Sequence, residues 1–221
     1  MKHLVIGHGE VGSALAELLA CDWLDVGAGR RTFSTYDVLH IAIPYGSHFL
    51  DAVRGYSQLW PDARVVVHSS VPLGTCDILG AIHSPVRGVH PNLLDGLRTF
   101  VKFFGGPGAS DVASAWPGVA RVLQNARTCE ALKLWDTTQY GVHIRLMQEI
   151  YRYCEIHGLP FDEVYELANA TYNHGFAALN RHDVVRPVLA YMGPDIGGHC
   201  VLPNAELLGG PVARVVRGGF D

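Results

Sequence analysis

The sequence contains no stretch of about 20 apolar residues, and it therefore predicts no membrane-spanning helix. The apolar run at the N-terminus ends at a glycine and is too short for the hydrophobic segment of a signal peptide. Basic charge is also scarce, since 17 Lys and Arg stand against 21 Asp and Glu, for a net charge of -4. Such a chain offers no positive field for a nucleic acid. We expect neither a membrane nor a nucleic acid among its partners.

Cysteine is sparse, and its spacing indicates neither a disulfide framework nor a metal site. The five cysteines form no close pair, and their odd number fits reduced thiols better than a disulfide framework. We therefore expect a cytoplasmic protein. The sequence has 12 histidines but no His-x-x-His, His-x-x-x-His or Cys-x-x-Cys spacing, so we expect no metal site.

Apolar periodicity predicts a parallel sheet in the first half of the chain. Residues 3–6 are typical of a buried strand, three glycines follow, and residues 13–20 have helical spacing. Continuous apolar runs bounded by turn residues predict more strands that are covered on both faces. The further expected strands are 37–44, 63–72, 86–91 and 99–106, and the further expected helices are 46–60 and 111–124.

The pattern changes to long helices after about residue 126. Residues 129–158 contain one glycine, Gly141, and no proline, and their apolar positions recur at three and four. A second helix is expected over 161–179. The predicted fold class is α/β, a Rossmann-like parallel sheet domain at 1–126 followed by a smaller all-helical domain at 127–221.

The best-defined motif is the glycine turn after the first strand, which reads Gly7-His8-Gly9-Glu10-Val11-Gly12. In a dinucleotide fingerprint the first glycine permits a tight turn, the second lets the pyrophosphate approach the backbone, and the third packs helix against strand. Its position between a strand and a helix favours this interpretation. An S-adenosylmethionine site and a turn without a ligand are the alternatives.

The residue that would contact the adenosine ribose is ambiguous. An acid is expected about 20 positions after the glycines, but that region contains Arg30 and Arg31. Arginines there would suit the 2′-phosphate of NADP, which favours NADP over NAD. Asp25 takes the role of the acid if the second strand ends early, and the arginines are then solvated surface residues.

Several segments together resemble the UDP-glucose/GDP-mannose dehydrogenase family, within the wider 6-phosphogluconate and 3-hydroxyacid dehydrogenase-like group. They are "GHGEVG", "IAIPYG", "HSSVPLGT", "EALKLWDTTQYGVHIRLMQEIYRYCEIHGL" and "GPDIGGHCVLP". The resemblance implies an NAD-dependent enzyme that oxidises a sugar alcohol twice. It also implies that Pro44, Tyr45, Ser69 and Ser70 contact the cofactor.

The same resemblance assigns the chemistry to a thiol and an amine. Cys200 would attack an aldehyde to form a thiohemiacetal, and a second hydride transfer would give a thioester. Lys133 would stabilise the oxyanion. This role is notable because the chain has only three lysines. Glu130 lies one helical turn before Lys133, and we expect it to orient the amine.

Two catalytic positions depart from the family pattern. The family has asparagine where this chain has Thr137, and a water-activating aspartate where it has Asn204. Asparagine cannot act as a base, so hydrolysis of a thioester should be impaired. His199 or His143 could replace the base, although each is more simply interpreted as an ordinary surface or core histidine.

The resemblance stops before the family's UDP-binding C-terminal domain, so we expect a truncated member that acts on a smaller hydroxyl or carbonyl substrate. We also expect a homodimer that forms through the long helix at 129–158. A non-redox enzyme such as a methyltransferase, or a cofactor-binding regulatory module, are the alternative functions on the same frame.

Overall fold

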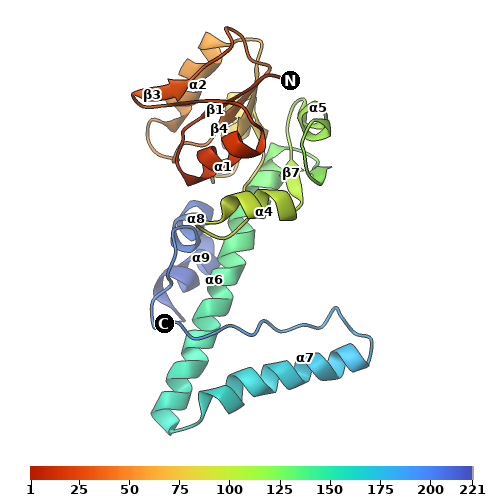
Figure 1. The fold of residues 1–221 in the computed structure, drawn as a ribbon. Helices are drawn as coiled ribbons and strands as arrows, with labels where there is room; N and C mark the ends of the chain where they lie inside the picture. Colours follow the sequence, from red (N-terminus) through yellow and green to blue (C-terminus); the bar gives the residue numbers. More distant parts are fainter. Residues whose placement is uncertain (221) are drawn as a thin grey trace. The chain divides into compact units, whose positions relative to one another are not determined.

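The computed structural model describes residues 1–220 and divides the chain into two compact units. The first is Met1–Lys133 and the second is Leu134–Asp221, where the sequence had predicted a boundary near residue 126. The first unit carries the sheet and the second is helical (Figure 1). The predicted fold class, a Rossmann-like sheet domain with a helical region after it, is confirmed.

The first unit is built on a six-stranded sheet in the order β3-β2-β1-β4-β5-β6. All neighbouring strands are parallel except β3, which forms an antiparallel hairpin with β2. Strands β2 and β4 thus lie on opposite sides of β1, so the direction in which strands are added reverses at β1. The strands are β1 His3–Ile6, β2 Asp22–Asp25, β3 Ala28–Arg30, β4 Val38–Ile41, β5 Arg64–Val67 and β6 Ile82–His83.

Helices cover both faces of this sheet, which explains its continuous apolar strands. Alternate strand residues point to opposite faces, so Val5 packs under one set of helices while Leu4 packs under the other. The first face is covered by α1 Glu10–Leu18, α4 Leu93–Thr99 and α5 Ala109–Ser114. The second face is covered by α2 Phe49–Leu59, α3 Thr75–Leu79 and the start of α6.

Two expected elements of the first unit are wrong. Residues 86–91 form no strand, because the chain has a positive-φ glycine at Gly88 and leads through Pro91 into α4. The helix expected at 111–124 ends at Ser114, before Pro117 and Gly118. Residues 120–122 instead form β8, Ala120–Val122, which pairs with β7, Lys102–Phe104, in a separate two-stranded parallel sheet.

The long helix α6, Ala126–His157, begins in the first unit and continues into the second. Asn125 caps its start, since the Asn125 Oδ1 atom accepts a hydrogen bond of 2.9 Å from the backbone N–H of Thr128. This cap explains why the helix begins before the predicted residue 129.

The second unit adds four helical segments after α6. The predicted second helix forms as a π-helical segment, Asp162–Leu167, and α7, Ala168–Ala178. Helices α8, Val201–Leu208, and α9, Gly210–Gly218, were not predicted. They close a small core of Ile196, Val201, Ala205, Ala213 and Val216.

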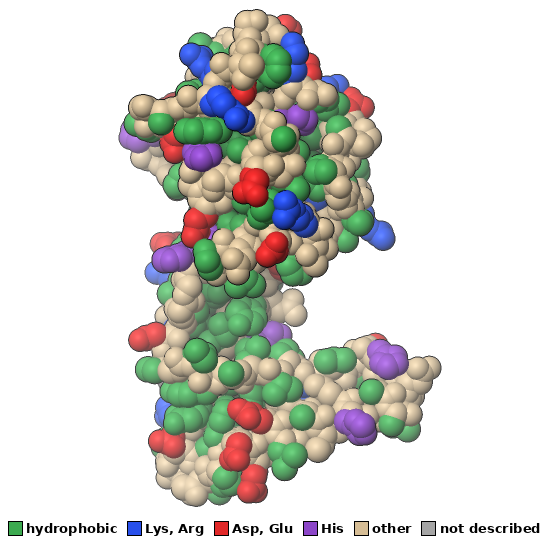
Figure 2. All heavy atoms as spheres, viewed as in Figure 1, with side chains coloured by type: hydrophobic (Ala, Val, Ile, Leu, Met, Phe, Trp, Pro, Cys, Tyr) green, Lys and Arg blue, Asp and Glu red, His purple; other side chains and the backbone are tan. Residues whose placement is uncertain are grey.

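Hydrophobic side chains remain exposed on the helical unit, and many are visible on the face drawn in Figure 2. The exposed large apolar residues of α6 are Trp135, Tyr140, Leu146, Tyr153 and Ile156. Within residues 1–220, no helix combines the length and apolar character needed to cross a membrane.

Candidate functional site

The glycine turn joins β1 to α1, and steric contacts within the protein require glycine at Gly7 and Gly12. Gly7 has a φ of +91°, and a Cβ there would lie 2.7 Å from the carbonyl oxygen of Ala42, which directly follows the neighbouring strand β4. A Cβ at Gly12 would lie 1.8 Å from the carbonyl oxygen of Gly7, so the helix can approach the turn only with glycine. Gly9 differs, because nothing lies within 4 Å of its Cβ position. The turn is therefore open at the middle glycine.

Helix α1 begins beside this open space without a side-chain cap at Gly9. The free N–H groups of a helix N-terminus attract anions. The backbone of Glu10, Val11 and Gly12 forms the first turn of this helix. The predicted turn thus has the space and the polarity that a pyrophosphate requires.

Asp25 is the last residue of β2, and its carboxylate lies against the glycine turn. It accepts hydrogen bonds from the backbone N–H groups of His8, at 3.0 Å, and Val26, at 2.8 Å. These bonds lower the pKa of Asp25 below its ordinary value, so the group is a carboxylate at neutral pH. The ring of His8 stacks on Trp23 at 3.8 Å and holds the turn beside β2.

The two arginines that suggested NADP are arranged differently from Asp25. Arg30 ends β3 and donates a hydrogen bond of 2.8 Å to the carbonyl oxygen of Cys21, just before β2 begins. Its Nε atom lies 3.6 Å from the Asp22 carboxylate. Arg30 is therefore engaged at the opposite end of β2 from Asp25, and Arg31 is exposed in the segment after β3.

The other predicted cofactor residues follow the carboxyl ends of β4 and β5. Pro44 and Tyr45 follow β4, and Ser69 and Ser70 follow β5. The Ser69 hydroxyl donates a hydrogen bond of 2.5 Å to the carbonyl oxygen of Ile43, which ties the two segments together. The glycine turn follows β1, so all three segments lie at one edge of the sheet where the strand order reverses. This is where ligands bind in open α/β sheets.

Glu10 has a partner that the sequence did not indicate. Its carboxylate contacts the Nδ1 atom of His90, in the segment that leads to α4. The side chain of Glu10 is thus directed to a neighbouring loop. Only the backbone N–H of Glu10 is then left for its predicted contact with a cofactor.

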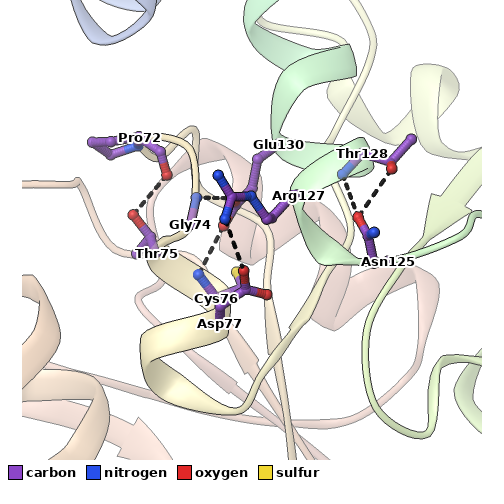
Figure 3. A network of polar contacts seen from close by, with 9 residues as sticks. All are labelled: Pro72, Gly74, Thr75, Cys76, Asp77, Asn125, Arg127, Thr128 and Glu130. Carbon is purple, nitrogen blue, oxygen red and sulfur yellow. Dashed lines mark hydrogen bonds and ion pairs between the residues drawn. The ribbon is translucent and has the colours of Figure 1, made fainter.

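Glu130 holds a backbone turn, a role that was not predicted from the sequence. Its fully buried carboxylate accepts hydrogen bonds from the backbone N–H groups of Gly74, at 2.5 Å, and Cys76, at 2.7 Å (Figure 3). Both carboxylate oxygens are used to hold the turn that follows Ser69 and Ser70. The Lys133 amine donates a hydrogen bond of 2.9 Å to the carbonyl oxygen of Val86, and its orientation by Glu130 stays a prediction.

In the helical unit, the structure brings Cys200, Thr137 and Asn204 together. Cys200 occupies the N-cap position of α8 without a side-chain capping bond, and its carbonyl oxygen accepts a hydrogen bond of 3.1 Å from the Asn204 backbone N–H. The buried Asn204 side chain donates to the Thr137 hydroxyl at 2.9 Å. Of the five cysteines, Cys200 is the one that is not buried. His199 is exposed beside it, and His143 lies in the middle of α6.

The residues that support this arrangement were not predicted from the sequence. A Cβ at Gly141 of α6 would lie 2.7 Å from Val201 and 2.8 Å from Val216, so glycine lets α8 and α9 pack on α6. Arg145 and Gln148 of α6 then hold the glycine-rich loop before Cys200 through its backbone carbonyls, at Pro194 (3.2 Å) and Gly193 (2.9 Å). The lone glycine in a long helical pattern was the available signal.

Comparisons with known proteins agree with this architecture. No protein-family model matches the sequence. A UDP-N-acetyl-D-mannosamine dehydrogenase of Methanocaldococcus jannaschii is 26% identical over 153 residues, which cover 62% of this chain and 33% of that protein. The chain therefore matches about a third of the length of this curated relative.

Two solved structures share the fold over nearly the whole chain. A UDP-D-ManNAc dehydrogenase from Pyrococcus horikoshii has a TM-score of 0.78 and 19% identity, with 98% of this chain and 67% of that chain covered. The 3-hydroxyisobutyrate dehydrogenase of Mycobacterium tuberculosis, solved with L-serine, has a TM-score of 0.71 and 14% identity, with 97% and 90% covered. The resemblance to the UDP-glucose/GDP-mannose dehydrogenase family that the sequence predicted is thus confirmed.

Proposed function

We propose that this protein is an NAD(P)-dependent oxidoreductase that acts on a small hydroxyl or carbonyl substrate. The observation that carries the proposal is the open, uncapped glycine turn beside the Asp25 carboxylate. A bound nicotinamide would supply the hydride acceptor or donor.

The turn fits the pyrophosphate of a dinucleotide for two reasons. The Cβ position of Gly9 has open space around it, and the N–H groups that begin α1 carry no side-chain cap. Together they provide room and hydrogen-bond donors for an anion. Ser69 and Ser70 follow β5 on the same sheet edge, where the resemblance implies contacts to the nicotinamide.

We propose a preference for NAD over NADP, which revises the expectation from the arginines. The Asp25 carboxylate at the end of β2 is suited to accept hydrogen bonds from ribose hydroxyls and to repel a 2′-phosphate. Arg30 is already bonded to Cys21 and close to Asp22, and so it does not offset that repulsion.

The helical unit supports a role in substrate chemistry. The partly exposed Cys200 stands at the N-terminus of α8, where helix N–H groups stabilise negative charge. The neighbouring Asn204 amide cannot activate water, because an amide is not a base at neutral pH. We therefore propose that oxidation stops at the carbonyl level, after transfer of one hydride from carbon and loss of one proton from the hydroxyl. Lys133 as the oxyanion donor and His199 as a substitute base remain predictions.

We further propose that the protein works as a homodimer in the cytoplasm. The apolar residues that α6 leaves exposed support a subunit contact along this helix. The buried thiols of Cys21, Cys76, Cys129 and Cys154 form no disulfide within residues 1–220, which supports a reducing compartment.

The experiment is a calorimetric titration with NAD, NADP and S-adenosylmethionine, followed by absorbance at the reduced nicotinamide band with a panel of small alcohols. We expect NAD to bind and to be reduced by a member of the panel. Binding of S-adenosylmethionine alone would favour a methyltransferase. NAD binding without reduction by any alcohol would favour a regulatory module.

The variant Gly9→Ala separates a binding defect from a folding defect. Its methyl group meets no protein atom within 4 Å but enters the space proposed for the pyrophosphate, so NAD binding should be lost while the thermal midpoint stays unchanged. The matched control is Gly55→Ala in the middle of α2, where a Cβ also meets nothing within 4 Å. Full NAD affinity in Gly9→Ala would contradict the proposed site.

A further inference from the structure

Three histidines and a lysine form a continuous hydrogen-bonded row across neighbouring strands. The Nδ1 atom of His3 lies 2.9 Å from Nε2 of His40, and Nδ1 of His40 lies 2.8 Å from Nε2 of His68. Nδ1 of His68 then lies 3.1 Å from the amine of Lys102. The row begins on β1, crosses β4 and the end of β5, and finishes on β7.

The two ends of the row differ in their access to water. His3 is partly exposed and lines a surface hollow of about 380 Å³. His40 is fully buried, and His68 and Lys102 are each only 3% exposed. The row therefore leads from the partly exposed His3 to a buried amine, around which closely packed side chains exclude bulk solvent.

The geometry restricts how protons are arranged in this row. Each ring-to-ring contact needs a hydrogen on one nitrogen and a lone pair on the other. The Lys102 amine donates two hydrogen bonds, to the carbonyl oxygens of Ser84 at 2.7 Å and Pro85 at 2.8 Å. The remaining bonding direction of the Lys102 nitrogen faces His68. There a neutral amine accepts a hydrogen bond from the ring, whereas an ammonium donates one to it.

When Nδ1 of His68 bonds to the Lys102 amine, each of these two possibilities fixes the state of every ring. With a neutral amine, each histidine carries its hydrogen on Nδ1 and donates toward Lys102. With an ammonium, each histidine carries its hydrogen on Nε2 and donates back toward the surface. Nδ1 of His68 also lies 2.7 Å from the Ser84 carbonyl oxygen, a contact that suits the state with hydrogen on Nδ1.

We propose that His3, His40 and His68 form a proton wire through which Lys102 exchanges protons with solvent. A proton from water binds Nε2 of His3, and the Nδ1 proton of His3 passes to Nε2 of His40. The Nδ1 proton of His40 passes to His68, and that of His68 passes to the amine. The net change is one proton gained by Lys102 and a switch of tautomer in all three rings.

The electrostatic surroundings are compatible with this cycle. Burial is the main cause that lowers the pKa of Lys102 well below its ordinary value, the Lys133 ammonium adds to this effect, and Cys129 opposes it. Burial likewise lowers the pKa values of His40 and His68. The rings are therefore neutral and carry one hydrogen each, as a wire requires.

Other charged groups also face the ends of the row. Burial is the main cause that lowers the pKa of His3 below its ordinary value, the N-terminal amine adds to this effect, and Asp37 opposes it. His83 on β6 faces the inner end beside His68. These groups set the pH at which a proton enters the row without interrupting its hydrogen bonds.

The inner end of the wire touches a segment that matters for the proposed chemistry. Lys102 holds the carbonyl groups of Ser84 and Pro85, and Lys133 donates to the next carbonyl, that of Val86. A proton that arrives at Lys102 therefore places a second positive charge next to Lys133. The wire itself does not depend on the proposed function, because it can be measured without cofactor or substrate.

The test uses the full chain with ¹⁵N-labelled histidine and lysine in NMR experiments that report ring tautomers and the Lys102 amine. As pH falls, the three rings should change together from hydrogen on Nδ1 to hydrogen on Nε2 at the pH where Lys102 becomes an ammonium. Tautomers that stay fixed through this transition, or that change at separate pH values, would overturn the wire.

Variants test the path. In His40→Phe the ring volume is kept and the row is broken, so exchange of the Lys102 Nζ hydrogens with water should slow by about tenfold or more. His3→Phe breaks the row at its partly exposed end, and it decides the question if His40→Phe does not fold. The control is His174→Phe on exposed α7, which should leave exchange unchanged. Exchange at the original rate in a folded His40→Phe or His3→Phe protein would overturn the proposal.

Discussion

The side-chain amide of Asn204 donates a hydrogen bond of 2.9 Å to the hydroxyl of Thr137, so the two positions that depart from the family pattern contact each other. The resemblance implies an amide at position 137 and a carboxylate at 204. Here the amide stands at 204 and the acceptor at 137. The two departures are therefore hydrogen-bonded to each other within the helical unit, and a substitution at either residue should remove a partner of the other.

Removal of the amide should destabilise the helical unit. Asn204 is only 3% exposed, and Asn204→Ala loses the hydrogen bond and leaves the Thr137 hydroxyl without this partner. We expect a loss of about 1–3 kcal/mol in the free energy of unfolding, measured by urea denaturation. Thr137→Ser keeps the acceptor hydroxyl and should lose less. An equal loss in both variants would show that the contact itself contributes little.

Gly141 should be essential for the packing of α8 and α9. In Gly141→Ala the new methyl group would lie 2.7 Å from Val201 and 2.8 Å from Val216, so the helices must separate. We expect a loss of about 1–3 kcal/mol in unfolding free energy. The control Gly175→Ala on α7 meets no atom within 4 Å, and it should raise stability slightly because alanine favours a helix. A stabilised Gly141→Ala protein would contradict the packing described.

The sequence predicted the sheet and the long helix because their signals are local. Buried parallel strands appear as continuous apolar runs, and α6 has an unbroken helical period. Helices α8 and α9 are short, and they are stabilised by contacts with α6 that involve Gly141. Such contacts join residues far apart in the sequence, so no local pattern indicates them.

The candidate site shows the same division. The glycine turn was found because strand, turn and helix follow one another in the chain. The roles of Asp25 and Glu130 depended on where strands end and on which distant backbone groups a side chain reaches. The number of residues between Gly12 and Arg30 suggested a contact between Arg30 and the ribose of the cofactor. The antiparallel hairpin of β2 and β3 instead directs Arg30 to the start of β2.

Glu130 should be required for the turn between Ser70 and α3. In Glu130→Gln one carboxylate oxygen becomes an NH₂ group that faces a backbone N–H, so one hydrogen bond is replaced by a repulsive contact in a fully buried place. We expect a loss of about 2–3 kcal/mol, read from urea denaturation. The partly exposed Glu149, which pairs with Arg152, supplies the control Glu149→Gln, and this change should have little effect. Similar stability of the two variants would argue against a stabilising role for the two hydrogen bonds of Glu130.

Asp25 should control the choice of dinucleotide. In Asp25→Asn the charge that repels a 2′-phosphate is lost, while one oxygen still accepts a backbone hydrogen bond. The ratio of the NAD and NADP dissociation constants should move toward NADP by about tenfold, the equivalent of roughly 1.4 kcal/mol. Calorimetric titration of both cofactors measures it, with Asp51→Asn on α2 as the control. An unchanged ratio would remove Asp25 from the site.

The buried His83 should make the protein sensitive to acid. Burial lowers the pKa of this ring from 6.5 to about 4 in the folded state, and its Nε2 atom lies 3.1 Å from the Ser69 carbonyl oxygen. Below pH 6.5 the unfolded chain therefore binds a proton that the folded protein does not, so stability is full above that pH and falls between pH 6.5 and pH 4. The loss from this ring should reach about 3 kcal/mol. Urea denaturation from pH 7.5 to pH 4.5 should give a shallower slope for His83→Gln than for the unaltered protein, while His182→Gln should keep the original slope. A His83→Gln protein with the full slope would assign the acid sensitivity to other groups.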